Sequence, residues 1–253
     1  MLNIVILGTG NLATHLFRAF SQTAGVRVVQ VVGRNAESLR WFSKSVPTSS
    51  DFDSIADADI YLMALKDDAI ATVSKFLFGK KGVVAHTSGA TDMNILAPAN
   101  HGVFYPLQTF TKGKNIDFGN IPICVEGNAP ESLDTLKSLA GAISQNVHEI
   151  DSGQRKKLHL AAVFVNNFTN YLYGVGEEIC SEEGLSFDLL KPLILETAEK
   201  VRTMSPKEAQ TGPARRNDQK SIQNHLKLLK DEKHIALYTL LSEAIKKCHE
   251  EKL

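Results

Sequence analysis

The sequence of 253 residues is poor in cysteine and has no excess of charge of either sign. Its three cysteines, Cys124, Cys180 and Cys248, lie too far apart to resemble a zinc site or a disulfide framework. Few, scattered cysteines are typical of a reducing compartment, so we expect a cytoplasmic protein without a metal site.

Long apolar runs are also missing. No stretch of 18 apolar residues occurs, so we expect no membrane-spanning helix, and the first apolar run starts at residue 3, leaving no room for a signal peptide. The 28 Lys and Arg residues balance the 28 Asp and Glu residues. This balance gives no electrostatic reason to expect a nucleic acid or an anionic membrane as partner.

The first 150 residues alternate short apolar runs with amphipathic segments. Helical patterns at 12–24, 36–45 and 68–77 separate the first four runs. Continuous runs of Val, Ile and Leu are typical of strands buried on both faces of a parallel sheet. Residues 1–151 are therefore predicted to form a doubly wound α/β domain of the Rossmann type. The expected strands are Asn3–Leu7, Val26–Val32, Asp59–Leu65, Gly82–Ala85, Gly102–Tyr105, Ile121–Val125 and Val147–Ile150.

Residues 152–253 follow a different pattern and are predicted to form an all-α domain. Helical periodicity covers 153–183, 186–203 and 218–250, and strand-like runs are almost absent. Glycine and proline residues separate these segments. Pro192, inside the second segment, predicts a kink or a break there.

A glycine-rich turn joins the first expected strand to the first expected helix. Residues 8–13 read Gly-Thr-Gly-Asn-Leu-Ala, the G-x-G-x-x-A pattern of dinucleotide-binding turns. Gly8 would permit the tight turn, Gly10 would let the backbone approach a pyrophosphate, and the helix start would hold the anion. The alternative is that both glycines only form a turn. The residues expected to contact the cofactor here are Gly8, Thr9, Gly10, Asn11 and Leu12.

The end of the second expected strand favours NADP over NAD. An NAD site usually has an acidic residue there, which binds the ribose 2′-hydroxyl, but this chain has Arg34 and no acid before Glu37. A guanidinium binds a 2′-phosphate in a fork, whereas a carboxylate repels it. We therefore assign Arg34 to NADP; the alternative is a solvated residue at a helix start.

Two further strand ends are expected beside the cofactor, because ligands bind at the carboxyl ends of such strands. The backbone of Leu65 and Lys66 would pass beneath the cofactor, and Asp67 and Asp68 would cap the following helix. Ser88, after the fourth strand, would hydrogen-bond the cofactor or the substrate. A role for Ser88 as a turn residue is equally open.

A polar stripe marks the first apolar helix of the second half. His159 and Asn166 lie seven residues apart, on one face of a continuous α-helix, and Asn170 falls near the same stripe. Such a stripe needs buried partners or a wet cleft. We assign His159 and Asn166 as the catalytic residues, His159 as the acid or base and Asn166 to orient the substrate, and we assign Asn170 to substrate binding. The alternative is hydrogen bonding between helices in a dimer core.

Residues 209–225 form a second concentration of polar side chains. The adjacent Arg215 and Arg216 suggest an anion clamp, and Asp218 is placed to cap the last helical segment. We assign Arg216 and Thr211 to substrate binding. A charged surface loop is the alternative.

Six motifs are familiar as a set: GTGNLA at 8–13, KDDAI at 66–70, HTSGA at 86–90, YPLQTF at 105–110, HLAAVFVNN at 159–167 and TGPARRND at 211–218. With them the chain resembles uncharacterised Rossmann-like proteins whose C-terminal half is a helical domain of unknown function. Such proteins are often labelled NADP oxidoreductases and lie near pyrroline-5-carboxylate reductase and the 6-phosphogluconate dehydrogenase superfamily. The resemblance spans nearly the whole chain. It implies a Rossmann fold, NADP binding and dimerisation through the helical domain, but no settled substrate.

Two positions depart from that family. It commonly has His where Tyr105 stands and Gly where Asn217 stands. An essential acid at the first position would be lost in this chain, so we assign no catalytic role to Tyr105.

The main hypothesis is an NADP-dependent oxidoreductase that transfers hydride between NADP(H) and an unknown small metabolite bound between the domains. The long apolar helices of the second half predict a homodimer built through that half. The alternative function is a non-catalytic NADP-binding sensor or scaffold whose helical domain binds a partner protein. The departures at Tyr105 and Asn217 slightly favour this alternative.

Overall fold

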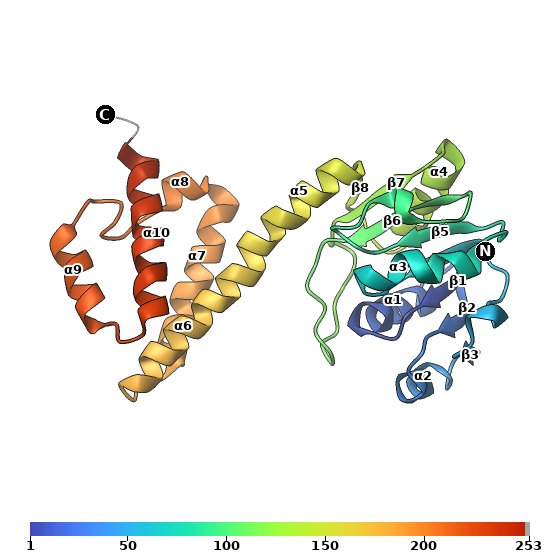
Figure 1. Ribbon diagram of the computed structural model, residues 1–253, viewed down its shortest axis with the longest axis horizontal. Coiled ribbons are helices and arrows are strands. Elements are labelled where there is room, and N and C mark those ends of the chain that lie inside the picture. The colour runs from blue at the N-terminus through green and yellow to red at the C-terminus, as the bar shows by residue number, and fades with distance from the viewer. Residues whose placement is uncertain (251–253) are drawn as a thin grey trace. The chain divides into compact units, whose positions relative to one another are not determined.

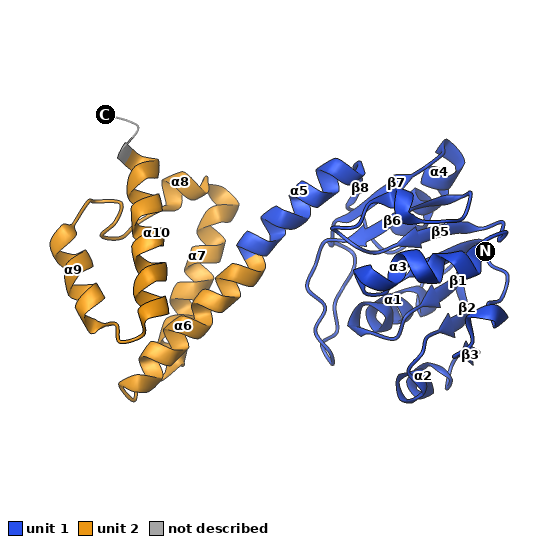
Figure 2. Ribbon diagram, in the orientation of Figure 1, with its two compact units in different colours: residues 1–165 blue, residues 166–253 orange. Residues whose placement is uncertain are grey.

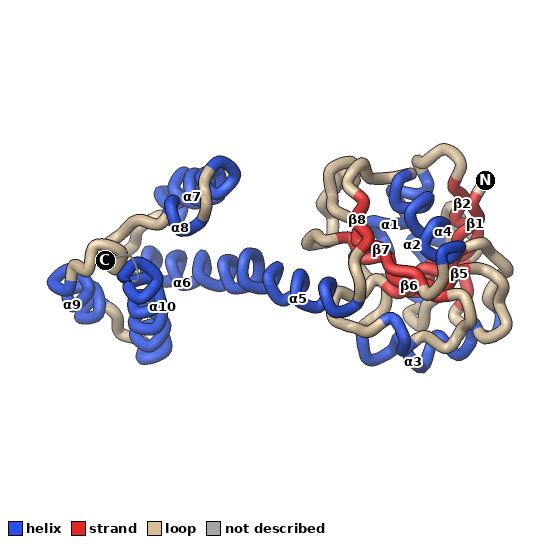
Figure 3. Tube along the Cα trace, turned by 90° about the horizontal axis from the view of Figure 1, so that it is seen from above, coloured by secondary structure: helices blue, strands red, loops and turns tan. Residues whose placement is uncertain are grey.

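The computed structural model describes residues 1–250 and divides the chain into two compact units. The first unit comprises Met1–Val165, and the second begins at Asn166 (Figure 2). Strands occur in the first unit, whereas the described residues from Asn166 onward form helices and loops (Figure 3). The predicted fold class, an α/β half followed by a helical half, is confirmed.

One eight-stranded sheet forms the centre of the first unit (Figure 1). Its order is β3-β2-β1-β4-β5-β6-β7-β8, and neighbouring strands run parallel except β6 and β7. Strand order reverses between β1 and β4, which is the topological switch point of a doubly wound fold. The strands are β1 (Leu2–Leu7), β2 (Val26–Val32), β3 (Thr48–Ser49), β4 (Ile60–Met63), β5 (Val83–His86), β6 (His101–Pro106), β7 (Ile123–Gly127) and β8 (Val147–Glu149).

Alternate residues of β1 pack into separate cores on the two faces of the sheet. Ile4 and Ile6 lie in one core, Val5 and Leu7 lie in the other, and all four are fully buried. A continuous apolar run is what a strand covered on both faces requires, so that expectation is confirmed. The covering helices are α1 (Asn11–Ser21), α2 (Ala36–Phe42) and α4 (Pro130–Gly141) on the first face and α3 (Asp67–Ser74) on the second.

Helix α4 and the antiparallel pairing of β6 with β7 are two features that the sequence pattern does not indicate. Only a narrow stripe of α4, formed by Leu136, Leu139 and Ala140 with Ser132, is buried, so its apolar periodicity is weak. An apolar run does not indicate whether its strand is parallel or antiparallel to the neighbouring strand. Here the loop 107–122 returns the chain to β7, which therefore runs against β6.

Helix α5 (Ser152–Ala162) belongs to the first unit, although the sequence pattern changes where it begins. The expected domain boundary lies at residues 151/152, whereas the compact units divide at 165/166. Side chains of α5, including Arg155 and His159, bond to residues of the first unit and hold the helix there. A π-helical turn over Val163–Phe168 then interrupts the expected continuous helix.

The described part of the second unit has almost no buried core. Among its residues up to His249, only Ala214 and Ile222 are buried. No helix within residues 1–250 has the length and apolar character to cross a bilayer. The helices of the second unit are α6 (Thr169–Glu182), α7 (Lys191–Thr203), α8 (Pro206–Ala209), α9 (Gln219–Leu228) and α10 (Glu232–Glu250). The large apolar side chains exposed along this unit are Phe168, Tyr171, Leu172, Ile179, Leu185, Leu189, Leu193, Leu195, Val201, Met204, Leu228, Leu240 and Leu241.

Pro192 lies in the first turn of α7, where its missing N–H removes no helical hydrogen bond. A 3₁₀ turn over Phe187–Leu190 precedes it, so the predicted break is confirmed. Asp218 caps α9 by accepting a hydrogen bond from the backbone N–H of Ser221, as predicted. The expected helix 218–250 is divided between α9 and α10.

Candidate functional site

The glycine-rich turn lies between β1 and α1, at the carboxyl end of β1. Gly8 has φ +122°, and a Cβ on it would lie 2.1 Å from the carbonyl oxygen of Ala64. Gly10 is the N-cap of α1, and a Cβ on it would meet nothing within 4 Å. No side chain caps this helix start, so its first N–H groups are available to an anion. The turn therefore fits the pyrophosphate of a dinucleotide.

Arg34 is exposed two residues beyond the end of β2, and it is the first charged side chain after that strand. Gly33 is buried, and a Cβ on it would lie 2.8 Å from the methyl group of Thr9 in the glycine-rich turn. Asn35 caps α2, and Glu37 lies in the first turn of that helix. The residue next to Arg34 therefore lies against the glycine-rich turn, and the guanidinium of Arg34 is exposed beside it.

A hollow of about 590 Å³ adjoins the glycine-rich turn. Thr9 and Asn11 of the turn line it together with Arg18, Glu37 and Lys112. Two cationic side chains and one carboxylate give this hollow a positive balance, which favours phosphate groups.

Leu65 and Lys66 follow β4, the neighbour of β1. A methyl carbon of Leu65 lies 3.4 Å from where a Cβ of Gly8 would stand, so this segment supports the turn. The expectation that Asp67 and Asp68 cap α3 is wrong. Lys66 is the N-cap residue, without a side-chain hydrogen bond, and both aspartates lie in the first helical turn. There their charges interact favourably with the helix dipole.

Ser88 is buried and shapes the chain after β5. Its Oγ accepts hydrogen bonds from the backbone N–H groups of Ala90, at 3.1 Å, and Thr91, at 3.0 Å. Ser88 is thus a turn residue. Its hydroxyl proton can still be donated, so its assignment to cofactor or substrate stays a prediction.

Tyr105 and His159 form a hydrogen-bonded pair that the sequence pattern does not indicate. The Tyr105 hydroxyl lies 3.0 Å from Nδ1 of His159, and the ring centroids are 5.9 Å apart in an edge-to-face arrangement. Gly89 lies against both rings. A Cβ on it would be 2.5 Å from Nδ1 of His159 and 2.8 Å from Cζ of Tyr105. The missing side chain at Gly89 therefore makes room for the pair.

The pair lies at the same edge of the sheet as the glycine-rich turn. The carboxyl ends of β1, β4 and β5 are in register, because Leu7 pairs with Met63 and Met63 with His86. His86 pairs in turn with Val103, two residues before Tyr105. Three strand spacings of ~4.8 Å separate β1 from β6, roughly 14 Å in all. Ligands of doubly wound folds bind along this edge.

A fully buried arginine holds α5 in place. The guanidinium of Arg155 is ion-paired with Glu126 of β7 and donates to the carbonyl oxygen of Thr91 and to Ser152 Oγ. Glu126 also accepts hydrogen bonds from the backbone N–H and the hydroxyl of Ser152. Arg155 precedes His159 by four residues and therefore shares its helix face. That spacing is the sequence signal that would have identified Arg155.

Burial sets the protonation of two side chains near α5. Burial, with a smaller contribution from Cys124 that Arg155 opposes, raises the pKa of Tyr105 to about 12. Burial and the charge of Arg155 together lower the pKa of His86 to about 4, against the opposing effects of Asp92 and Asp67. Both the phenol and the imidazole are therefore uncharged at neutral pH.

Asn166 and Asn170 are exposed residues of the second unit. The prediction that Asn166 shares a face with His159 assumes α-helical spacing throughout. The π-helical turn over Val163–Phe168 changes that spacing, so a shared face no longer follows from seven residues.

The other predicted substrate residues, Thr211 and Arg216, are also exposed and lie before α9. Arg215 donates to the carbonyl oxygen of Gln210, so its guanidinium holds the loop. Asn217 has φ +53°. This left-handed conformation favours Gly and Asn, which gives the departure at Asn217 a conformational reason.

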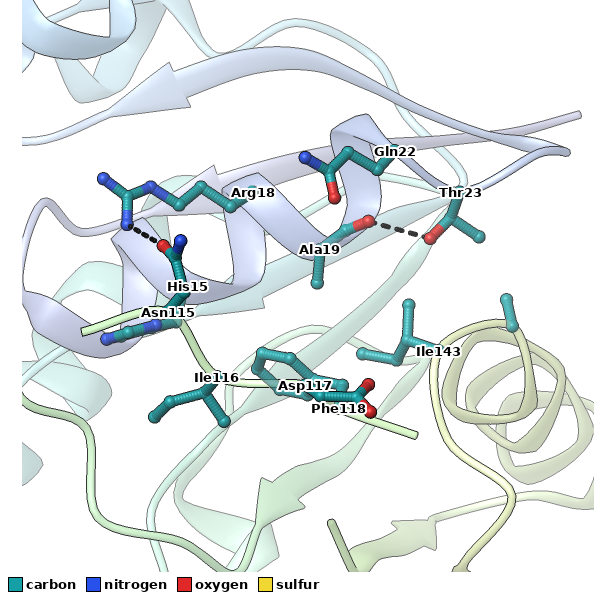
Figure 4. A pocket seen from close by; sticks show the side chains of 11 residues that line it. His15, Arg18, Ala19, Gln22, Thr23, Asn115, Ile116, Asp117, Phe118 and Ile143 are labelled. Carbon is teal, nitrogen blue, oxygen red and sulfur yellow. Dashed lines mark hydrogen bonds between the residues drawn. The ribbon is translucent and has the colours of Figure 1, made fainter. Parts of the chain in front are cut away.

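A groove of about 670 Å³ lies along the later turns of α1 (Figure 4). Ala19, Gln22 and Thr23 form one side, and segment 115–118 lies opposite, where Asn115 accepts a hydrogen bond from Arg18. The groove contains none of the predicted site residues.

Fold and turn together define a Rossmann-type dinucleotide-binding protein. A solved structure described as a "putative NADP oxidoreductase" from Bacteroides fragilis is 41% identical, with 97% of this chain and 98% of that chain covered at a TM-score of 0.89. The family model described as a domain of unknown function, DUF2520, matches residues 121–245. The chain belongs to the family of the Bacteroides fragilis protein, and the expected family is confirmed.

More distant structures share the fold alone. An imine reductase of Myxococcus stipitatus in complex with NADP⁺ is 14% identical over 99% of this chain and 95% of that chain, with a TM-score of 0.68. A 1-pyrroline-5-carboxylate reductase of Streptococcus pyogenes is 16% identical over 99% and 97%, with a TM-score of 0.61. No curated protein matches the sequence.

The depressed pKa of His86 predicts a loss of stability in mild acid. Between pH of about 6.5 and 4 the unfolded imidazole binds a proton and the folded one does not, so unfolding becomes easier as the pH falls through this range. The loss should reach about 3 kcal/mol and level off near pH 4. Urea unfolding at pH 7.5, 5.5 and 4.5 measures it. His86→Gln should flatten the profile, whereas His148→Gln, at an exposed position, should not. Equal slopes for wild type and His86→Gln would contradict the assignment.

Proposed function

We propose that the protein is an NADP-dependent oxidoreductase acting on a small metabolite. One observation carries the proposal: a hydrogen-bonded imidazole, that of His159, lies at the same sheet edge as an anion-ready glycine-rich turn. The name of the 41% identical relative supports the reaction class, and the imine and pyrroline-5-carboxylate reductases share the fold. Imines, keto acids and hydroxy acids are the candidate substrate classes.

The cofactor would be held by the turn and the neighbouring strand ends. Backbone N–H groups at Gly10, Asn11 and Leu12 would bind the pyrophosphate, and Arg34 would bind the 2′-phosphate. Thr9, Leu65 and Lys66 would flank the cofactor, and Ser88 would donate its hydroxyl proton to the cofactor or the substrate. When bound, the nicotinamide supplies or accepts hydride.

His159 would exchange the proton that accompanies the reaction. Its Nδ1 is engaged by Tyr105, so Nε2 is the nitrogen left for a substrate. Asn166, Asn170, Thr211 and Arg216 are proposed to orient the substrate and hold an anionic group on it. Their exposed amide, hydroxyl and guanidinium groups suit those tasks.

The second unit is proposed to bury its apolar surface against a second copy of the chain. A unit with two buried residues among those described cannot stabilise itself by a core of its own. A closed homodimer is the simplest arrangement that covers identical apolar faces. The three free cysteines suit a cytoplasmic location.

Cofactor preference is the first prediction for this function. NADPH should bind at least about tenfold more tightly than NADH, a difference of ~1.4 kcal/mol, because Arg34 pairs with the 2′-phosphate. Isothermal titration measures both affinities. Arg34→Asp should reverse the order, while Arg40→Asp, a control on the following helix, should not. Equal wild-type affinities would remove the basis for NADP.

Turnover tests the reaction class itself. Purified protein is screened with imines, keto acids and hydroxy acids by NADPH absorbance, alongside thermal shift. With any substrate found, His159→Ala should lower kcat roughly 10²–10⁴-fold, the usual worth of a positioned acid or base, with NADPH affinity unchanged. A mutant that is destabilised yet fully active would assign His159 to structure. NADPH binding without turnover of any candidate would count against the enzyme.

Assembly is predicted from the exposed apolar helices. The full-length protein should sediment as a dimer at micromolar concentration, because Leu189, Leu193 and Leu195 are 59–70% exposed in the single chain. A double substitution of Leu189 and Leu193 by Glu should yield monomers. A wild-type monomer at that concentration would contradict the proposal.

A further inference from the structure

Tyr105 is held where it can act on His159 and on little else. Its ring is buried at the end of β6, and the hydroxyl reaches Nδ1 of His159 at 3.0 Å. Gly89 lies so close to both rings that a Cβ on it would overlap them. Two further groups act on the hydroxyl electrostatically: Cys124 raises the pKa of Tyr105, and Arg155, one helical turn before His159, lowers it.

We propose that Tyr105 is a positioning residue, which binds Nδ1 of His159 through its hydroxyl in each protonation state and so makes Nε2 the proton-exchanging atom. The inference rests on the proposed function, in which His159 is the acid or base. It adds the residue that fixes the imidazole and the nitrogen that faces the substrate.

The phenol is suited to this role because its oxygen can accept a hydrogen bond while the hydroxyl keeps its own proton. Toward neutral His159 the hydroxyl oxygen accepts from Nδ1–H, so the free lone pair of the ring is on Nε2. Toward the imidazolium the hydroxyl oxygen accepts from Nδ1–H. The ring can therefore change its charge without changing its partner or its place.

Tyr105 itself does not supply the proton. Burial raises the pKa of Tyr105 to about 12, so the phenol keeps its proton throughout the neutral range. In the direction of reduction, the N–H bond at Nε2 of the imidazolium breaks as a new bond forms to the oxygen or nitrogen of the substrate. Nδ1 keeps its proton and its hydrogen bond to the Tyr105 oxygen, so the neutral ring is left with a free lone pair on Nε2.

A double-mutant cycle tests whether Tyr105 acts through His159. Tyr105→Phe keeps the ring and should lower kcat about 5- to 20-fold, the usual worth of one hydrogen bond, with KM for NADPH unchanged. In the His159→Ala background the same change should have no further effect on kcat. Tyr61→Phe is the control, because this buried tyrosine also loses one hydrogen bond, from the N–H of Ala58, outside the site. Additive effects of Tyr105→Phe and His159→Ala would overturn the proposal.

A second variant disturbs the pair without removing a polar group. Gly89→Ala places a methyl group into His159 and Tyr105 and should lower kcat at least tenfold. Gly141→Ala, where a Cβ would meet nothing within 4 Å, should leave kcat unchanged. Wild-type turnover by Gly89→Ala would show that the position of His159 is unimportant and would count against Tyr105 as well.

A spectroscopic readout separates this proposal from the proposed function. The ¹⁵N resonance of Nδ1 of His159 should differ between wild type and Tyr105→Phe while the other histidines keep their shifts, whether or not a substrate is known. If no turnover is found but the resonance moves, the reaction class fails and the positioning contact stands. An unchanged resonance overturns the contact even in an active enzyme.

Discussion

The position of the candidate site depends on one buried ion pair, that of Arg155 with Glu126. A guanidinium without contact to water is costly unless it is paired and hydrogen-bonded, and here Glu126, Thr91 and Ser152 engage it. Removing one partner from such a pair usually costs about 3–5 kcal/mol. The first turns of α5 are thereby fixed against β7 and the chain after β5. His159, one turn later, meets Gly89 and Tyr105 as a consequence.

The sequence predicts what is local and misses what is brought together by the fold. Gly8 and Gly10 are recognisable because a turn and a close backbone approach need glycine at closely spaced positions of the chain. Strands buried on both faces are recognisable as continuous apolar runs. The contact of Tyr105 with His159 spans 54 residues, and no pattern within either segment encodes it. The ion pair of Arg155 with Glu126 is similarly non-local: the four-residue spacing places Arg155 on the helix face of His159, but nothing in the sequence pairs it with Glu126.

Two departures from the family pattern change their meaning once the structure is considered. Asn217 adopts a left-handed backbone, so Asn replaces Gly there with little conformational cost, and no side-chain chemistry need be lost. Tyr105 is a partner of His159, because its hydroxyl lies at hydrogen-bonding distance, 3.0 Å, from Nδ1 of that residue. Both positions had favoured a non-catalytic sensor. Because each departure now has a physical reason, neither Tyr105 nor Asn217 supports the sensor hypothesis any longer.

The two units differ in how much of their chemistry a single chain determines. In the first unit, Gly8, Arg34, Tyr105 and His159 lie on elements that two cores and the Arg155 ion pair hold in place. In the second, Asn166, Asn170 and Arg216 are exposed on a unit that lacks a core, so their surroundings depend on what covers its apolar helices. Cofactor binding and proton exchange can thus be argued from one chain. Under the proposed function, the choice of substrate would depend on these exposed residues and on what covers the apolar helices, so a single chain supports the reaction class better than the substrate.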